Sequence, residues 1–214
     1  MNRPRWVQHN KWGEHGESIH AGTQATVGDA SEAADAAVRR LLARGAYHPA
    51  LEALVRGYQH LIVRHCVAML GDAGQGEEVA QEVFLGAYAA LPRFRRQASV
   101  RTWLLAIARK QCLKALRDRR RRRRLEEDKR DDIARGAHRA PPDPAEEDRE
   151  VRRQRVRRGL DRLGTAERTV LLLRYETKLT LVEVAHVLGR SETSVRRQLA
   201  RALAQLGEVL DADR

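Results

Sequence analysis

The segment FRRQASVRTWLLAIARK, from Phe94 to Lys110, combines side chains that seldom occur together. Two of only nine aromatic residues in this 214-residue chain, Phe94 and Trp103, stand here among five Arg and Lys residues. A hydrophobic core uses the rings but not the charges, and a phosphate-binding surface uses the charges but not the rings. Single-stranded nucleic acid uses both, because bases stack on rings while phosphates pair with cations. The segment therefore predicts a site for unpaired nucleic acid.

A second candidate site lies in TLVEVAHVLGRSETSVRRQLARAL, from Thr180 to Leu203. Thr180 followed by Glu183 forms a capping box that starts one helix. Gly189 supplies a turn and Ser191 caps a second helix. This layout is that of a helix-turn-helix, whose second helix enters the major groove of DNA. The alternative is an ordinary amphipathic hairpin with a basic solvent face.

The second helix of this hairpin has one apolar and one basic face. The predicted buried stripe is Val195, Leu199, Ala202 and Leu206. The side chains predicted to meet DNA are Thr193, Ser194, Arg196, Arg197 and Arg201. Arginine can bond guanine with two parallel hydrogen bonds. The sequence does not decide which of the three arginines meets a base and which a phosphate.

The charge of the chain is large and unevenly placed. The net charge is +12 and the isoelectric point is about 10.7. Residues 93–124 hold fourteen basic residues and one acidic residue, whereas residues 125–150 hold five basic and ten acidic residues. A basic balance indicates an anionic partner, nucleic acid first and an acidic membrane surface second. Such asymmetry also indicates that different segments meet different partners.

The elements that must position these sites are helices. Apolar residues recur at helical spacing over 49–70, 77–91 and 100–120, and shorter helices are expected over 150–163, 165–176, 180–188 and 191–208. The fold class predicted is all-α, with two small helical domains joined by a flexible acidic linker. The predicted boundaries are a weakly ordered extension over 1–45, a first domain over 46–124, a linker over 125–149 and a second domain over 150–214. Within the extension, 31–44 could form a short helix.

The predicted third helix, from Val100 onward, has a face that combines one ring with cations. Trp103, Lys110, Lys114 and Arg117 fall together on a helical wheel, opposite the apolar residues. Trp103 could instead anchor the core against the preceding helix. The side chains predicted to bind or melt nucleic acid are Phe94, Arg95, Arg96, Gln97, Ser99, Arg101, Trp103, Lys110, Lys114 and Arg117.

Several classes of protein are disfavoured by the residues. The eight His residues are scattered, and neither a catalytic triad, a metal-ligand spacing nor a Gly-rich phosphate loop is visible. We therefore expect no enzyme, no cofactor and no metal. Cys66 and Cys112 are expected to be buried free thiols, which fits a reducing cytoplasm. No apolar run approaches the ~20 residues that a membrane span needs.

The two sites in this order resemble an extracytoplasmic-function (ECF) sigma factor of the sigma-70 family. The resemblance covers about residues 46–210. It rests on EEVAQEVFLGAYAALPRFRRQASVRTWLLAIARK, similar to region 2, and on LDRLGTAERTVLLLRYETKLTLVEVAHVLGRSETSVRRQLARALAQL, similar to region 4. Two matches in the right order and at the right separation are more specific than either one alone.

The resemblance implies a bacterial cytoplasmic, nucleoid-associated protein that binds core RNA polymerase and promoter DNA. Region 2 would capture a flipped −10 base and open the duplex, and region 4 would read the −35 element. The face that would dock on the beta-prime coiled coil is Glu77, Glu78, Gln81, Glu82 and Leu85. The beta flap and an anti-sigma factor are further partners that the resemblance allows.

The sequence departs from the family pattern at several positions. The usual Asn after IAR is Lys110, and the usual Asp four residues later is Lys114. Gly164 and Thr165 stand where an LP pair is usual. Two rival functions remain open: a stand-alone helix-turn-helix regulator, which gives Phe94 to Lys110 no role, and an RNA-binding protein, which leaves the helix-turn-helix unexplained.

Overall fold

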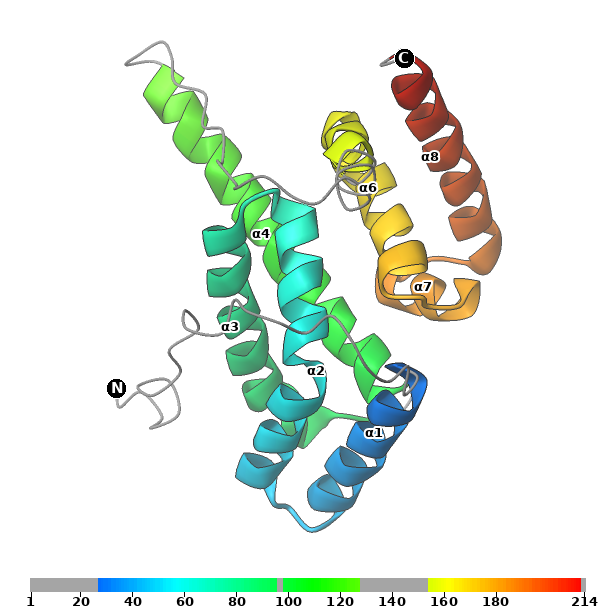
Figure 1. The fold of residues 1–214 in the computed structure, drawn as a ribbon. Helices are drawn as coiled ribbons and strands as arrows, with labels where there is room; N and C mark the ends of the chain where they lie inside the picture. The colour runs from blue at the N-terminus through cyan, green and yellow to red at the C-terminus, as the bar shows by residue number, and fades with distance from the viewer. Residues whose placement is uncertain (1–26, 96–97, 128–153, 213–214) are drawn as a thin grey trace, which may run out of the picture.

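The computed structural model describes residues 27–95, 98–127 and 154–212, and these residues are helical with no strand among them (Figure 1). The predicted all-α class is confirmed. The helices are α1 (Val27–Ala43), α2 (Tyr47–Leu70), α3 (Ala73–Ala90), the short 3-10 turn η2 (Leu91–Arg93), α4 (Val100–Glu127), a helix over 154–162, α6 (Thr165–Leu171), the short π-helical segment η3 (Leu172–Glu176), α7 (Leu181–Leu188) and α8 (Glu192–Ala212).

Helix α2 is the centre of an N-terminal bundle formed by α1 to α4. Its apolar stripe is buried, as its helical spacing predicts. The members of the stripe with no more than a trace of exposure are Leu51, Leu54, Tyr58, Ile62, Cys66 and Met69. The helix ends at Gly71, which has φ of 73° and closes the last turn with a hydrogen bond from its N–H to the carbonyl of Val67.

Helix α3 begins earlier than the sequence predicts. The sequence predicts a start near Glu77, because the GDAGQG stretch contains three glycines. Instead the Asp72 carboxylate accepts a hydrogen bond from the backbone N–H of Gln75 at 2.8 Å and caps a helix that starts at Ala73. Gly76 is buried against α2, where its missing Cβ allows the two helices to approach closely.

Two glycine substitutions in α3 are expected to have opposite effects on stability. A Cβ at position 76 would lie 2.5 Å from Cγ2 of Val67 and 2.8 Å from its Cα, so Gly76→Ala should lower the free energy of unfolding by about 1–3 kcal/mol. At position 74 the nearest atom is Oδ1 of Asp72 at 3.6 Å, so Gly74→Ala should be neutral or stabilising by up to ~1 kcal/mol. Urea denaturation of both variants checks this; equal midpoints would contradict the close approach.

Part of the predicted N-terminal extension belongs to the bundle. Residues 1–26 lie outside the described residues, but α1 occupies Val27–Ala43 and packs on α2 and α4. Val38 is fully buried. The Asp35 carboxylate accepts hydrogen bonds from the Tyr58 hydroxyl at 2.6 Å and from the backbone N–H of Val100 at 3.1 Å. The short helix expected over 31–44 within the predicted extension is therefore part of α1, which begins at Val27.

Helix α4 is the longest element and carries both the core face and the basic face. It extends well past the bundle in Figure 1. Leu104, Leu105 and Ala108 are fully buried. Cys66 and Cys112 are free and buried, as predicted. Hydrogen bonding to Cys112 and burial raise the pKa of Cys66, which favours the protonated thiol. The predicted linker begins within the end of α4, and its remaining residues lie outside the described residues.

The C-terminal unit is formed by 154–162 and α6 to α8. Its apolar centre consists of Val170, Leu173, Leu179, Val184 and Val195, each with no exposed surface. Helices α6 and α8 pack together, and α7 packs on α8. The helices fall close to the ranges that the sequence predicts for this half of the chain. The predicted 165–176 segment is divided into α6 and η3.

The C-terminal unit docks on the N-terminal bundle. Helix α7 packs on α4, and η3 contacts α2 (Figure 1). The Thr102 hydroxyl donates to Glu183 at 3.3 Å, and a guanidinium nitrogen of Arg168 donates to the Met69 carbonyl at 3.4 Å. The buried side chains of both units form one continuous hydrophobic cluster. No helix among the described residues is long and apolar enough to cross a membrane.

Candidate nucleic-acid and polymerase interfaces

Phe94 and Trp103 lie against each other at the start of α4. Their ring centroids are 4.9 Å apart and the ring planes are tilted by 55°, an arrangement typical of aromatic pairs. Both rings are half-buried and pack on the core of the bundle. Trp103 is therefore compatible with both of its predicted roles, as a base-stacking surface and as a core anchor. Trp103 packs on Phe94 and on the core, and part of its side chain remains accessible to solvent.

Polar contacts fix the backbone beside these rings. The Ser99 hydroxyl accepts a hydrogen bond from the backbone N–H of Thr102 at 3.1 Å, which caps α4. The hydroxyl of Thr102 lies 2.8 Å from that of Ser99. Arg101 donates through its guanidinium to the carbonyl of Thr177 in the C-terminal unit. Two of the predicted nucleic-acid residues, Ser99 and Arg101, are thus already engaged within the chain.

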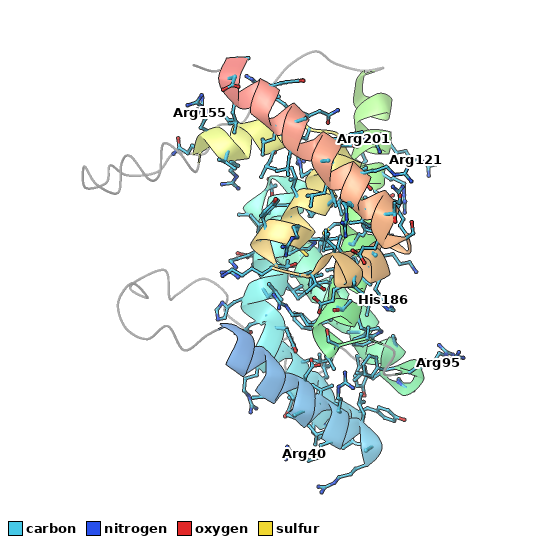
Figure 2. All side chains as sticks on the ribbon, turned by 90° about the vertical axis from the view of Figure 1, so that its right-hand side faces the viewer. Arg40, Arg95, Arg121, Arg155, His186 and Arg201 are labelled. Atoms are coloured by element: carbon cyan, nitrogen blue, oxygen red, sulfur yellow. The ribbon has the colours of Figure 1, made fainter. Side chains whose placement is uncertain are left out.

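The remaining predicted cations of this site project from the surface. Arg95, Lys110, Lys114 and Arg117 are exposed. Figure 2 labels Arg95 at the outer edge of the loop that precedes α4. The predicted residues Arg96 and Gln97 lie outside the described residues. The rings and the exposed cations of α4 therefore share one side of the bundle, with the rings at one end and a basic ridge along the helix.

The helix-turn-helix is built as the sequence predicts. Thr180 and Glu183 form a reciprocal capping box at the start of α7. Gly189 has φ of 62°, the left-handed conformation that ends α7 and allows the turn. The Ser191 hydroxyl accepts from the backbone N–H of Ser194 at 3.3 Å and caps α8. These contacts rigidly orient the exposed face of α8.

The predicted reading face of α8 is open to solvent. Thr193, Arg196, Arg197 and Arg201 are exposed and Ser194 is half-buried. Arg196 forms an ion pair with Glu192 at 2.7 Å, one turn earlier on the same helix. The charges of Arg197 and Arg201 are free of such a pair within the described residues. Opposite this face, Val195 and Ala202 are fully buried, while Leu199 and Leu206 are half-buried.

An acidic face lies on α3. Glu77, Glu78 and Glu82 are exposed, Gln81 is half-buried, and the apolar side chain of Leu85 is also exposed. These five residues form a continuous strip because they recur every three or four positions. The opposite face of α3, which includes Val79, Val83 and Phe84, is buried against the bundle. The strip is polar with one apolar side chain, which suits a partner surface.

Two residues that position the sites were missed by the sequence reasoning. Asp35 holds the start of α4 from a distant helix, and no local pattern marks it. Gln198 is buried in α8, where its side-chain amide donates to the Ala166 carbonyl at 2.9 Å and its oxygen accepts from Arg190 at 2.9 Å. Its place between Val195 and Ala202 on the buried face of the helix was the only signal for it.

Two known protein families match this chain, one over each of its two candidate sites. The Sigma-70 region 2 family matches residues 54–122, which include α3 and the described rings and cations of α4. The Sigma-70, region 4 family matches residues 159–208, which include the helix-turn-helix. The chain belongs to the sigma-70 family. Its N-terminal bundle thus contains region 2 and its C-terminal unit contains region 4.

Individual relatives agree with the family match. The chain is 36% identical over 157 residues to the ECF RNA polymerase sigma factor SigC of Mycobacterium tuberculosis, covering 72% of this chain and 79% of that protein. It is 30% identical over 173 residues to the RNA polymerase sigma factor CnrH of Cupriavidus metallidurans, covering 74% of this chain and 88% of that protein. The ECF-type resemblance found in the sequence is confirmed.

Solved structures share the fold. A structure of CnrH in complex with the cytosolic domain of CnrY superposes with a TM-score of 0.61 at 24% identity, covering 85% of this chain and 99% of that chain. The sigma factor RpoE of Bartonella quintana, in complex with the anti-sigma factor NepR, gives a TM-score of 0.59 at 17% identity, covering 76% and 98%. The sigma-70 helical fold therefore extends over both regions.

The chain is accordingly a sigma factor that directs transcription initiation. The two rival functions are not favoured. A stand-alone helix-turn-helix regulator does not account for region 2, and an RNA-binding protein that uses the arginine run does not account for region 4. A sigma factor, in contrast, accounts for both family regions.

Proposed function

We propose that region 2 of this sigma factor traps the unpaired strand of the −10 element while region 4 reads the −35 element as duplex. The observation that carries this division is the contrast between the two exposed basic surfaces. The surface of region 2 combines Trp103 and Phe94 with cations, whereas the exposed face of α8 carries arginines without a ring. Aromatic rings stack with unpaired bases, whereas arginines donate hydrogen bonds to base edges in the major groove of duplex DNA.

In region 2 we assign the −10 contacts to the loop before α4 and to the outer side of α4. The residues are Phe94, Arg95, Arg96, Gln97, Ser99, Arg101, Trp103, Lys110, Lys114 and Arg117. Lys110 and Lys114 replace the family's usual Asn and Asp, and both are exposed. Added cations strengthen phosphate contacts by releasing counterions. We therefore expect tighter but more salt-sensitive −10 binding than the family pattern implies.

In region 4 we assign the −35 contacts to Thr193, Ser194, Arg196, Arg197 and Arg201. The ion pair between Arg196 and Glu192 restrains Arg196 along the helix. Arg197 carries no such restraint and is exposed near the N-terminal end of α8, the part of a recognition helix that meets base edges. Arg197 is therefore the better candidate for direct readout of a base.

We assign core polymerase binding to the acidic strip of α3, Glu77, Glu78, Gln81, Glu82 and Leu85, against the beta-prime coiled coil. The beta flap would contact region 4. An anti-sigma factor is a further expected partner, because the sigma factor RpoE of Bartonella quintana, which shares this fold, is solved in complex with the anti-sigma factor NepR. The action is regulatory, without catalysis by the chain itself, and its place is the bacterial cytoplasm at the nucleoid.

Run-off transcription tests the proposal. Bacterial core RNA polymerase is supplied with randomised promoter templates, with and without this chain. Start sites that appear only with the chain, and that share two spaced sequence elements, are the expected result. A core enzyme that gains no start sites, while the chain alone shifts duplex DNA, would point instead to a stand-alone regulator.

Replacing Arg197 with alanine should weaken sequence-specific −35 recognition. A good arginine–guanine pair contributes ~1–3 kcal/mol of discrimination, which is roughly a 5- to 150-fold loss of preference for the cognate −35 sequence. Competition binding of holoenzyme to cognate and scrambled −35 templates measures it. Arg158→Ala is the matched control, since Arg158 is an exposed arginine of the C-terminal unit outside α8. Equal losses on both templates would assign Arg197 to a phosphate.

A further inference from the structure

Helix α1 lies outside residues 54–122, which match region 2, yet two of its side chains contact the start of α4. Asp35 and Arg39 are one turn apart on α1, and they bind backbone groups of Val100 and Ala98. Figure 1 shows α1 beside the end of α4 at which this helix begins. These contacts join α1 to the segment that follows the loop assigned to the −10 strand.

Asp35 completes the N-terminal cap of α4. The Ser99 hydroxyl accepts from the backbone N–H of Thr102, but the N–H of Val100 has no acceptor within its own helix. The Asp35 carboxylate accepts this hydrogen bond at 3.1 Å, and its second oxygen accepts from the Tyr58 hydroxyl at 2.6 Å. A carboxylate at this end of a helix is also favoured by the helix dipole. The start of α4 is therefore fixed to α1 and, through the same carboxylate, to α2.

Arg39 holds the residue that precedes this cap. One nitrogen of its guanidinium donates to the carbonyl of Ala98 at 3.2 Å, and the same nitrogen lies 3.6 Å from a carboxylate oxygen of Asp35. Asp35 thereby orients Arg39 toward the loop. The side chain of Arg39 is 36% exposed, whereas the neighbouring Val38 is fully buried and anchors the helix. The two charged side chains of α1 therefore act together on the backbone on either side of Ser99.

The loop assigned to the flipped −10 base is anchored at both ends. At one end, the ring of Phe94 packs on Trp103 with a centroid distance of 4.9 Å. At the other end, the carbonyl of Ala98 is bound by Arg39. The residues between these two anchors are 95–97, all of which are assigned above to the −10 element. Arg39 therefore supplies the second anchor of the loop.

Region 4 contacts the same segment, but its contacts compete with promoter binding. In the docked arrangement Arg101 donates to the Thr177 carbonyl, and the Thr102 hydroxyl donates to Glu183. Because Arg101 is itself assigned to the −10 strand, its bond to Thr177 must open before it binds DNA. The contacts from α1, in contrast, lie entirely within the N-terminal bundle. They are therefore the contacts that can hold the loop while the promoter is bound.

We propose that Arg39 is a positioning residue for capture of the flipped −10 base. Arg39 does not touch the base; it fixes the Ala98 end of the loop, so that the base-binding residues are ordered before the promoter binds. A loop that is ordered in advance loses less conformational entropy on binding, so more of the stacking energy appears as affinity. The inference rests on the proposed role of region 2, because it gives α1 a function in that same site.

Binding of holoenzyme to premelted promoter templates tests this role. The promoter is one found by the run-off experiment, and its non-template −10 strand carries a single abasic position at each site in turn. Removal of the captured base should weaken binding of the wild-type holoenzyme by roughly 5- to 150-fold. Arg39→Gln should weaken binding to the intact template by about 3- to 10-fold and leave binding to that abasic template nearly unchanged. The affinity gained from the captured base should therefore shrink by the same factor.

Two further variants separate positioning from a general loss of charge. Arg40→Gln removes the same charge from the exposed neighbour of Arg39 and should bind both templates like the wild type, because Arg40 and Arg95 lie well apart in Figure 2. Arg39→Lys keeps a charged donor and should restore most of the affinity for the intact template. The thermal unfolding midpoints of the free Arg39→Gln and Arg40→Gln chains should be similar, since Arg39 is partly exposed.

Loss of discrimination against the abasic template is the result that supports the positioning role. Full wild-type discrimination in Arg39→Gln would overturn the inference. Equal weakening on the intact and abasic templates would assign Arg39 to a DNA phosphate or to the stability of the bundle, and would overturn it as well. A wild-type holoenzyme that binds intact and abasic templates alike would instead contradict the proposed strand trap itself, whatever the behaviour of Arg39→Gln.

Discussion

Trp103→Ala is expected to lower promoter opening by roughly 5- to 150-fold while holoenzyme assembly is unchanged. The reason is that stacking of a base on an aromatic ring contributes ~1–3 kcal/mol, and Trp103 supplies the larger ring of the pair at the start of α4. Reactivity of unpaired thymines to permanganate in the −10 region measures opening. Native gel analysis of the holoenzyme measures assembly in the same samples.

The same ring packs against Phe94, so loss of opening has to be separated from loss of structure. Trp103→Phe keeps a ring and should restore most of the opening, whereas Trp103→Ala should not. Tyr47→Ala is a suitable control, because it removes an exposed ring at the start of α2 that is not among the residues assigned to the −10 element. Normal opening by a folded Trp103→Ala protein would mean that the ring serves the core alone.

Local patterns in the sequence predict most of the helices correctly. The apolar stripes of α2 and α4 are long enough for the helical period to be unambiguous, and the stripes are buried as expected. The capping box at Thr180 and the left-handed Gly189 fix the helix-turn-helix to within a residue. These signals work because each depends on residues fewer than five positions apart.

The errors arise where distant contacts decide the structure. The local sequence predicts a break at Gly76, although contact with Val67 makes a glycine necessary inside α3. The short helix expected over 31–44 is part of α1, which begins earlier, at Val27, and is held in the bundle by the buried Val38 and by Asp35, which contacts Tyr58 and the start of α4. Tertiary contacts of this kind override the local propensity of the chain.

The docking of region 4 on region 2 could not be predicted at all. It depends on the hydrogen bond between Thr102 and Glu183 and on the hydrogen bond from Arg168 to the Met69 carbonyl at the end of α2. Neither contact is marked by a periodic pattern in the sequence. The placement of the exposed site residues, in contrast, follows from the helical wheel. The faces of α3, α4 and α8 were predictable, and their relation to one another was not.

Glu82→Lys is expected to weaken binding of the chain to core RNA polymerase by about tenfold or more, which corresponds to about 1.4 kcal/mol. Glu82 lies in the middle of the acidic strip of α3 and is exposed, so the change reverses one charge without disturbing the buried face. A partner surface that accepts this strip must be complementary in charge, and a lysine there introduces like-charge repulsion. Fluorescence titration of labelled chain with core enzyme measures the dissociation constant.

Glu52→Lys supplies the comparison, because Glu52 is an exposed acid near the start of α2 and its replacement changes the net charge by the same amount. If the total charge of the chain governed binding, both variants would weaken it equally. A selective effect of Glu82→Lys would instead identify the α3 strip as the polymerase-binding surface. Binding by Glu82→Lys at the wild-type strength would remove the strip from the interface, and the exposed Leu85 beside it would then have no partner. Because Glu82 lies on α3, away from the rings and from α8, binding of −10 single-stranded DNA by the free variant should stay unchanged, which separates polymerase docking from promoter recognition.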